Sequence, residues 1–411
     1  MKGMNGKRPK IRFPEFTDDW EERKFTEGVS EIGDGLHGTP IYSDNGDVFF
    51  INGNNLIEGK IVINPETKSV DGNQQSFSDK SLDDTTILMS INGTIGNLAY
   101  YSGERLMLGK SVAYMKVSNF DKGFVYAYLQ APSVQSYFMD RLTGTTIKNL
   151  GLKVIREMNL FVPQDMEEQK KIGKFFSDFD KHIVIYQKKL EHLQELKKSL
   201  LQKMFPKKGE EVPEVRFPGF SRDWEQRKLG DMVSFSKGSG YSKGDLKEDG
   251  TPIILYGRLY TKYETVISEV DTFADEKKGA VFSKGGEVIV PASGETAEDI
   301  SIASVVEKSG VLLGGDLNII TPADDMDPAF LAISISNGKP HNDMAKMAQG
   351  KSVVHLHNSD LEKIDLPYPS YAEQRRISGF FSDLDHLITL HQRKLEHIKE
   401  LKNYMLQNMF V

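Results

Sequence analysis

The 411-residue chain contains no cysteine at all. This absence excludes disulfides, thiolate metal sites and a cysteine nucleophile. Long apolar runs are missing too, because no stretch approaches the roughly 18 to 20 apolar residues that a membrane span needs. The first ten residues, MKGMNGKRPK, are polar and lack the apolar segment of a signal peptide. We therefore expect a cytoplasmic protein that does not enter a membrane.

An excess of positive charge is also missing. The formal net charge is −7, which argues against a chain that holds nucleic-acid phosphates by its bulk charge. The charge is uneven, however: residues 167–208 contain eleven Lys or Arg and six Asp or Glu, a local balance of +5 (11 − 6). DNA binding by this chain must then depend on focal contacts or on a partner that supplies positive charge.

Motifs of motor enzymes and methyltransferases are absent. Gly109-Lys110-Ser111 and Gly350-Lys351-Ser352 resemble the end of a phosphate-binding loop, but Glu104 and Ala345 occupy the positions where that loop needs a glycine. The chain has no adjacent prolines, so it lacks the Asn-Pro-Pro-Tyr type of motif with which adenine methyltransferases hold the amino group. We expect neither ATP hydrolysis nor methyl transfer from this chain alone.

Two further patterns resemble catalytic or metal sites only superficially. Glu168-Gln169-Lys170 resembles half of a nuclease site and returns as Glu373-Gln374-Arg375, and we interpret both as helix starts with solvated charges. His355 and His357 could share one face of a strand, but no further ligands have suitable spacing. The sequence therefore predicts no catalytic residue and no metal site.

The dominant feature that is present is an internal repeat. RFPEFTDDWEERK at Arg12–Lys24 returns as RFPGFSRDWEQRK at Arg216–Lys228, an offset of 204, and Glu168–Phe205 returns as Glu373–Phe410, an offset of 205. The two stretches between these blocks have almost equal lengths and share little sequence. This pattern predicts one scaffold kept in two copies, with a different surface on each.

The second repeated block is typical of a long helix. Its apolar residues alternate in steps of four and three, which is a heptad pattern, and some 35 residues at about 1.5 Å each give a rod of roughly 50 Å. A helix with one apolar stripe needs a partner, so we expect the two copies to pair as an antiparallel coiled coil related by a pseudo-twofold axis. Each stripe could instead cover only its own domain. The predicted pairing residues are Ile172, Phe176, Phe179, Ile183, Tyr186, Leu190 and Leu193 in the first copy, and Ile377, Phe381, Leu384, Ile388, His391, Leu395 and Ile398 in the second.

The divergent stretches are predicted to be mixed α+β domains. Short apolar runs between Gly, Asn and Asp indicate strands, and each stretch has one predicted helix, at residues 123–141 and 327–348. Residues 205–215 form a charged linker rich in Pro and Gly. The predicted strands are 48–51, 60–63, 86–90, 97–101, 111–117 and 158–162 in the first stretch, and 252–255, 287–291, 300–306, 317–321 and 363–368 in the second.

Polar loops at the ends of these strands are the candidate DNA-binding residues. Amide side chains can read base edges, Asn especially adenine, and small donors suit phosphate contacts. Each loop alone could be an ordinary surface turn, and only the repetition at equivalent positions favours a binding role. The candidates are Asn52, Asn54, Asn55, Asn92, Thr94, Lys110, Thr145, Thr146 and Lys148 in the first stretch, and Tyr256, Arg258, Tyr260, Ser293, Thr296, Lys351, Ser352 and His355 in the second.

With these blocks in this order, the chain resembles the specificity subunit of Type I restriction–modification systems. The resemblance rests on the repeated blocks Arg12–Lys24 and Arg216–Lys228, on the closing segments at residues 144–172 and 349–377, and on the helix ends LEHLQELKKSLLQKMF and LEHIKELKNYMLQNMF. It spans essentially the whole chain. It implies a target recognition domain at residues 1–163, a long helix and linker at 164–211, a second recognition domain at 212–369 and a second helix at 370–411.

The resemblance also implies a role and partners. Each recognition domain would read one half of an asymmetric site in double-stranded DNA, and the paired helices would set the spacer and dock two adenine-N6 methyltransferase (modification) subunits. This chain would hold no cofactor; S-adenosylmethionine would belong to the modification subunits, and ATP and Mg²⁺ to the restriction and translocase subunits. The alternatives are a coiled-coil scaffold, a stand-alone DNA-binding protein and a solitary enzyme.

Overall fold

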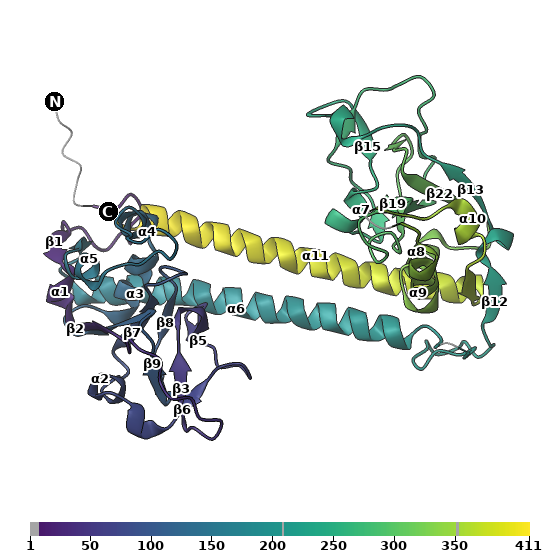
Figure 1. Cartoon of the computed structure of the whole chain (residues 1–411). Helices are drawn as coiled ribbons and strands as arrows, with labels where there is room; N and C mark the ends of the chain where they lie inside the picture. Colours follow the sequence, from purple (N-terminus) through teal and green to yellow (C-terminus); the bar gives the residue numbers. More distant parts are fainter. Residues whose placement is uncertain (1–7, 208, 351–352) are drawn as a thin grey trace, which may run out of the picture. The chain divides into compact units, whose positions relative to one another are not determined.

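The chain folds into two compact units that share the two long helices. The computed structural model describes residues 8–207, 209–350 and 353–411 (Figure 1). Unit 1 comprises Met1–Lys188 and Gln392–Val411, and unit 2 comprises Lys189–His391. Each unit therefore contains one of the divergent stretches together with the start of one long helix and the end of the other.

The secondary structure of unit 1 is a mixture of short strands and short helices that precede α6 (Met166–Lys203). The strands are β1 (Glu21–Lys24), β2 (Val29–Asp34), β3 (Val48–Ile51), β4 (Leu56–Ile57), β5 (Lys60–Ile61), β6 (Ser69–Val70), β7 (Thr86–Ser90), β8 (Leu98–Tyr100), β9 (Leu106–Leu108), β10 (Val112–Val117) and β11 (Asn159–Val162). The helices are α1 (Phe25–Gly28), α2 (Phe77–Lys80), α3 (Lys122–Gln130), α4 (Pro132–Met139) and α5 (Leu152–Arg156), with 3-10 turns η1 (Gly53–Asn55) and η2 (Gly72–Gln74).

The central sheet of unit 1 has the strand order β2-β10-β7-β8 and is buried on both faces. Because side chains alternate along a strand, Ile87 and Met89 enter the main core, which α3 and α4 cover, while Leu88 enters a second core. This second core lies against the smaller sheet β6-β3-β9. Burial on both faces explains why the β7 sequence TILMS has no exposed side chain.

Unit 2 repeats this plan with different strand lengths and precedes α11 (Tyr371–Asn408). Its strands are β12 (Glu225–Lys228), β13 (Val233–Lys237), β14 (Leu246–Lys247), β15 (Thr251–Ile254), β16 (Val266–Ile267), β17 (Phe273–Ala274), β18 (Glu287–Pro291), β19 (Ser293–Gly294), β20 (Ser304–Val306), β21 (Leu312–Leu313), β22 (Leu317–Pro322), β23 (Val354–His355) and β24 (Asp365–Tyr368). Its helices are α7 (Arg258–Thr261), α8 (Pro328–Ile335), α9 (Gly338–Met347) and α10 (Asn358–Leu361), with turns η3 (Leu229–Asp231) and η4 (Lys243–Asp245).

The main sheet of unit 2 has the order β13-β22-β18-β20-β16, and a second sheet has the order β14-β17-β15-β21. Along β18, Val288 and Val290 face the core that contains α8, and Ile289 faces the second core. The two units therefore share one construction, in which a central strand separates two cores. The prediction of a mixed helix and sheet fold with two repeated domains is confirmed.

Each of the two predicted domain helices is in fact a pair of shorter helices. The prediction of one helix at residues 123–141 is wrong because Pro132 forces Ala131 into an extended conformation (φ −60°, ψ 137°), which ends α3 and opens α4. In unit 2, extended Asn337 (φ −136°, ψ 159°) separates α8 from α9. The side chains of Asp121 and Asp327 accept a backbone hydrogen bond of 2.8 Å at the start of α3 and α8 respectively.

Within each unit, the start of one long helix lies beside the end of the other. In unit 1 the ring of Phe176 on α6 stacks on Phe410, which follows α11, with centroids 5.6 Å apart. Farther along α6, Asp180 pairs with Lys402 at 2.5 Å, so the two segments run antiparallel. In unit 2 the equivalent ion pair joins Lys197 to Asp385, also at 2.5 Å.

None of the fourteen predicted pairing residues is exposed. Ile172 and Phe176 belong to the main core of unit 1, and Ile377 and Phe381 to that of unit 2, so the start of each stripe covers its own domain. The predicted pairing residues farther along each helix, at 179–193 in α6 and 384–398 in α11, lie on the less exposed side of that helix. Leu384 and Leu395 are buried, and Phe179, Ile183, Tyr186, Leu190, Leu193, Ile388, His391 and Ile398 are half-buried.

Each unit's core is closed by the end of the other copy's helix. Phe410 packs against Trp20, Phe124 and Tyr128 in unit 1, and Phe205 packs against Trp224 and Phe330 in unit 2. Phe205 is therefore part of a core and not of the linker that the sequence suggested.

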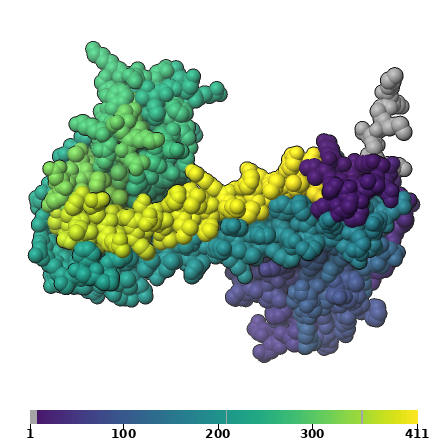
Figure 2. Space-filling model, turned by 180° about the vertical axis from the view of Figure 1, so that it is seen from behind, coloured from purple at the N-terminus to yellow at the C-terminus, as the bar shows by residue number. Residues whose placement is uncertain are grey.

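The segment that enters each domain contacts the end of the long helix that closes that domain's core, α11 in unit 1 and α6 in unit 2. We call residues 11–24 and 215–228 the entry segments. In unit 1 the N–H of Ile11 donates to the carbonyl of Asn408 at 2.9 Å, and Figure 2 shows the N-terminal residues covering this end of α11. In unit 2 the N–H of Val215 donates to the carbonyl of Lys203 at 2.9 Å. The entry segment and the returning helix end are thus joined in the same way in both units.

A buried carboxylate holds the entry segment to the first turn of each long helix. Arg12 donates two hydrogen bonds to Glu168, at 2.7 and 2.8 Å, and the indole N–H of Trp20 donates a third at 3.2 Å. Glu168 is 1% exposed. The interpretation of this position as a solvated helix start is therefore wrong, because Arg12, 156 residues away in the chain, covers and neutralises it.

Unit 2 contains the same three-residue clasp. Arg216 donates to Glu373 at 2.7 and 2.8 Å, and Trp224 donates at 3.3 Å. The neighbouring glutamines extend both networks: Gln169 accepts from the N–H of Asp121, and Gln374 accepts from that of Asp327, each at 2.9 Å. Each clasp, with its neighbouring glutamine, thus joins the first turn of a long helix to its entry segment and to the start of α3 in unit 1 or α8 in unit 2.

We expect Arg12→Met to destabilise unit 1 by about 3 kcal/mol, because removal of one partner leaves a buried carboxylate unpaired. Urea unfolding in a Trp224→Phe background measures this, since Trp20 is then the only tryptophan. The matched control is Arg8→Met, which removes an ion pair to Asp19 whose side chains are each 58% exposed and which should cost about 0–1 kcal/mol. Equal costs for the two variants would contradict the proposed importance of the clasp.

Candidate nucleic-acid interface

In unit 1, four polar loops meet at one end of the central sheet. The side-chain amide of Asn92, which follows β7, donates to the carbonyl of Lys110 at 2.9 Å. The N–H of Gly93 donates to the carbonyl of Lys148 at 3.1 Å, and that of Gly53 donates to the hydroxyl of Ser111 at 2.9 Å. We call residues 52–55, 92–96, 109–111 and 143–149 the loop edge of unit 1.

Six of the nine candidate side chains in unit 1 are exposed on this edge. Among the described residues, these six side chains make no hydrogen bond or ion pair, so they are available to a ligand. They are Asn54, Thr94, Lys110, Thr145, Thr146 and Lys148.

The other three candidates in unit 1 build the loops. Asn55 is 8% exposed, and its side-chain oxygen accepts from the N–H of Asn52 at 3.0 Å while its amide donates to the carbonyl of Val62. The side-chain oxygen of Asn52 accepts from Ser111 at 3.0 Å, and the amide of Asn92 is used as described above. The predicted role of Asn52, Asn55 and Asn92 in base reading is not supported by this placement.

Unit 2 places its candidate loops at the equivalent end of its sheet. A hairpin in which Gln349 and His355 exchange backbone hydrogen bonds matches the one formed by Thr143 and Asn149. Its closing residue pairs with Ser293, as Asn149 pairs with Asn92. The divergent stretches thus present different residues on the same loop framework.

Several candidates in unit 2 are committed to internal contacts. Arg258 is 9% exposed and donates to Asp271 at 2.6 Å and to Glu264 at 2.7 Å, so its charge is neutralised inside the unit. Ser293 is 8% exposed and its hydroxyl lies 3.0 Å from Nδ1 of His355. The predicted DNA contacts of Arg258 and Ser293 are therefore not supported.

The remaining candidates of unit 2 are more accessible. Thr296 is exposed, although its hydroxyl accepts from the N–H of Asp299 at 3.1 Å. The half-buried rings of Tyr256 and Tyr260 lie with centroids 6.1 Å apart and offer aromatic surface. Lys351 and Ser352 lie outside the described residues.

The two edges differ in charge. The edge of unit 1 exposes Lys110 and Lys148, whereas the loops at the equivalent end of unit 2 expose Glu295, Glu298 and Asp316. Because DNA phosphates repel carboxylates, the described part of unit 2 offers less backbone attraction.

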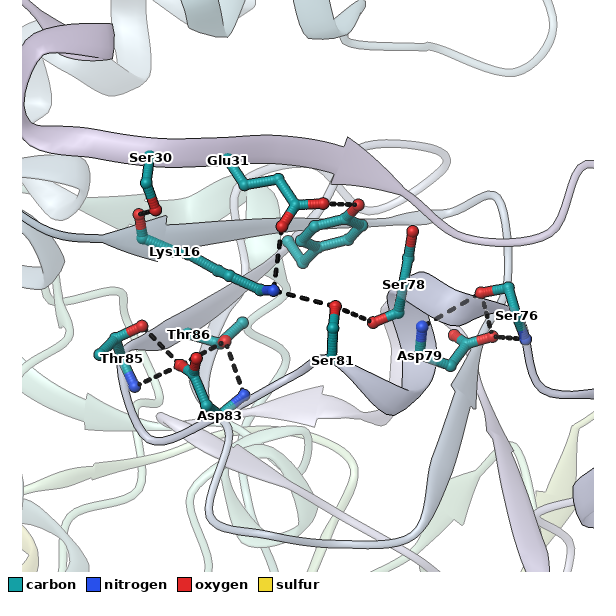
Figure 3. Close-up of polar contacts among 11 residues, drawn as sticks. Ser30, Glu31, Ser76, Ser78, Asp79, Ser81, Asp83, Thr85, Thr86 and Lys116 are labelled. Carbon is teal, nitrogen blue, oxygen red and sulfur yellow. Dashed lines mark hydrogen bonds and ion pairs between the residues drawn. The ribbon is translucent and has the colours of Figure 1, made fainter.

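A different polar cluster lies at the opposite end of β10. The ammonium of Lys116 lies 2.9 Å from both Glu31 and Ser81, and the hydroxyl of Tyr114 donates to Glu31 at 2.8 Å (Figure 3). These contacts from Lys116 and Tyr114 lower the pKa of Glu31. The cluster fastens the segment after α2 to the sheet, and its contacts between distant strands left no local signal in the sequence.

The described part of the chain has no group of three or more His, Asp or Glu side chains that could hold a metal ion. His355 contacts Ser293, and His357 precedes α10 with its N–H donating to Asp360 at 3.2 Å. In the same described residues, no helix is long and apolar enough to cross a membrane.

Comparison with known proteins identifies the family. The model of the Type I restriction modification DNA specificity domain matches twice, at residues 17–195 and 221–400. The chain belongs to this family. The resemblance to Type I restriction–modification specificity subunits, which the repeated sequence blocks suggested, is confirmed.

Relatives of the specificity subunit support this membership along most of its length. The MjaVIII specificity subunit of Methanocaldococcus jannaschii is 22% identical over 318 residues, which cover 74% of this chain and 73% of the relative. A second sequence from that organism, described as a type I restriction enzyme MjaX specificity subunit, is 24% identical over 419 residues, with 96% and 93% covered.

Solved structures share the fold of the specificity subunit. The S subunit of a Type I system from M. genitalium matches with a TM-score of 0.65 at 15% identity, covering 98% of this chain and 99% of that one. A chain from a structure describing complex assembly and conformational transition of the type I R-M system matches with a TM-score of 0.53 at 14% identity, covering 94% and 96%. At these identities the likeness concerns the fold.

We expect Lys110→Gln and Lys148→Gln each to reduce the salt dependence of DNA binding by about one unit of slope, since each removes one focal phosphate contact. Fluorescence anisotropy of labelled double-stranded DNA titrated with the specificity subunit over a salt series measures the slope. The matched control is Lys308→Gln, an exposed residue beyond the end of β20 that lies away from the loops of unit 2. A slope that falls as much for the control would contradict the assignment.

Proposed function

We propose that this specificity subunit reads an asymmetric, bipartite DNA target, with the loop edge of each unit contacting one half. The observation that carries this proposal is that one loop framework occurs twice with unlike side chains. The bridge between Asn149 and Asn92 in unit 1 recurs as the pairing of His355 with Ser293 in unit 2. Two unlike surfaces on one framework suit two unlike half-sites.

The proposal assigns the chemistry to partner subunits. Modification subunits would bring S-adenosylmethionine and act on a target adenine that is flipped out of the duplex. Restriction and translocase subunits would bring ATP and Mg²⁺. The sequence supports this division, because it has no P-loop and no Pro-Pro dipeptide, and the specificity subunit then directs these reactions without performing them.

The long helices would dock two modification subunits and set the spacer between the half-sites. Exposed apolar residues recur on both helices at the repeat offset of 205: Ile185 with Leu390, 48% and 46% exposed, and Leu196 with Leu401, 38% and 36% exposed. Each unit presents one residue from each helix. One such pair in each unit suits two copies of one partner.

Exchange of residues 25–163 for the equivalent stretch of another specificity subunit should change one half of the methylated site only. The reason is that the loop edge of unit 1 lies wholly within the exchanged residues. Methylome sequencing of a host that expresses the chimera with its modification subunit measures the outcome. An unaltered target would favour the scaffold alternative, and a change in both halves would contradict independent reading by the two units.

Insertion of one heptad into both α6 and α11, midway along each helix, should lengthen the unread spacer and leave both half-sites unaltered. One heptad adds about 10 Å to a helix at 1.5 Å per residue and keeps the apolar stripe in phase. The same methylome assay measures the spacer. Insertion of two residues is the control, because it turns the rest of each apolar stripe by about 200° and should abolish methylation. A seven-residue insertion with an unaltered spacer would contradict the role of the helices.

A further inference from the structure

Unit 1 contains a cleft at the head of α6, away from its loop edge. The cleft has a volume of about 610 Å³, within the range of about 300–1,000 Å³ that is typical of ligand sites. It lies beside the paired strands β1 and β11, which supply Glu21, Arg23 and Val162. Its walls are formed by Glu21, Arg23, Thr26, Glu27, Asn119, Phe120, Val162, Pro163, Gln164, Met166 and Gln169.

The internal repeat shows what occupies the equivalent place in unit 2. In the paired strands, Glu21 lies opposite Val162, and Glu225 lies opposite Tyr368, so Tyr368 takes the position of Val162. By the same register, Arg227 is the equivalent of Arg23. One wall of the cleft therefore carries a small side chain in unit 1 and an aromatic ring in unit 2.

The opposite wall is related in the same way. Asn119 lies two residues before Asp121, the capping residue of α3, and Asp325 lies two residues before Asp327, the capping residue of α8. Asp325 is therefore the equivalent of Asn119. Both walls of the cleft thus have named counterparts in unit 2.

In unit 2 the ring of Tyr368 spans the distance between these two walls. The guanidinium carbon of Arg227 lies 4.3 Å from the ring centroid, a cation–π contact. The Tyr368 hydroxyl donates to the Asp325 carboxylate at 2.7 Å. Burial, together with this hydrogen bond, raises the pKa of Tyr368 to about 12, so the hydroxyl keeps its proton. Unit 2 fills its own cleft with a tyrosine.

Unit 1 has the same walls without the ring. Arg23 is held by Glu21 and Glu27, each at 3.1 Å, and its side chain is 44% exposed. The amide nitrogen of Asn119 donates to the carbonyl of Glu27 at 2.9 Å, which leaves its oxygen as an acceptor. Val162 and Pro163 supply an apolar floor.

We propose that this cleft receives a tyrosine side chain of the modification subunit that docks on unit 1. The ring would stack beneath Arg23 and its hydroxyl would donate to the side-chain oxygen of Asn119, as Tyr368 does between Arg227 and Asp325. The inference rests on the proposed docking function, because the cleft adjoins the first turn of α6. The carboxylates of Glu21 and Glu27 disfavour a phosphate-bearing occupant, so the ligand is protein and not DNA.

The proposal makes the two docking sites unequal. Unit 1 accepts an aromatic side chain from outside, whereas Tyr368 already occupies the equivalent place in unit 2. Two identical modification subunits would therefore bind the two units with different affinities. Isothermal titration of the full chain with the modification subunit measures both affinities.

Val162→Tyr should fill the cleft from within and weaken the tighter of the two binding events about tenfold, the size expected for loss of one aromatic anchor. Arg23→Gln, an exposed change that leaves the floor intact, should weaken the same event. The matched controls are Tyr368→Val and Arg227→Gln in unit 2, which should not weaken it. Thermal unfolding of each variant verifies that the fold is retained.

A small probe tests the cleft without the partner. N-acetyl-tyrosinamide, added to the full chain, should shift the methyl resonances of Val162 and Met166 by ring currents, and Arg23→Gln should abolish the shift. N-acetyl-leucinamide should give none. Absence of the tyrosine shift overturns the proposed cleft chemistry.

The two experiments separate this inference from the proposed function. If the modification subunit binds the wild type and Val162→Tyr equally, the tyrosine anchor is overturned while docking stands. If it binds neither, the docking function and the choice of partner are overturned, and the probe experiment alone decides whether the cleft takes tyrosine.

Discussion

The buried carboxylate at the head of each long helix is the constraint on which the rest of the structure depends. Glu168 and Glu373 are each 1% exposed, and a charge in such a place persists only if it is fully paired. Arg12 and Arg216 supply that pairing from entry segments far away in sequence. The clasp therefore ties the entry segment to the first turn of the long helix, and the neighbouring glutamine ties that turn to the start of α3 or α8.

The fold was predictable where the signal was local. The heptad steps from Ile172 to Leu193 give the long helix, and the apolar runs at β3, β7 and β18 give strands with the observed bounds. The break at Pro132 was also local, since a proline restricts the residue before it. The burial of Glu168 was not, because its partner lies 156 residues away.

The candidate interface shows the same limit. Repetition of polar loops at equivalent positions predicted candidates that lie at one end of each sheet, as Thr94, Lys110 and Lys148 do in unit 1. The sequence could not distinguish amides that face outward from amides that close a turn, and Asn55 is of the second kind. Arg258 likewise lies between two tyrosines in the sequence, which made it a candidate for DNA binding. The carboxylates that neutralise it, Glu264 and Asp271, come later in the chain. That Tyr368 occupies the position of Val162 is visible only from the register of the paired strands, which places both opposite the repeated glutamate.

The position of Phe410 has a consequence for synthesis on the ribosome. The closing aromatic of unit 2, Phe205, is translated before the sheet that it covers. Unit 1 precedes unit 2 in the chain, yet Phe410, whose ring packs against both Trp20 and Phe124, follows Trp20 by 390 residues (410 − 20). Unit 1 is therefore the first unit to leave the ribosome and the last to be completed. A chain that stops before Phe410 lacks the ring that closes the core of unit 1.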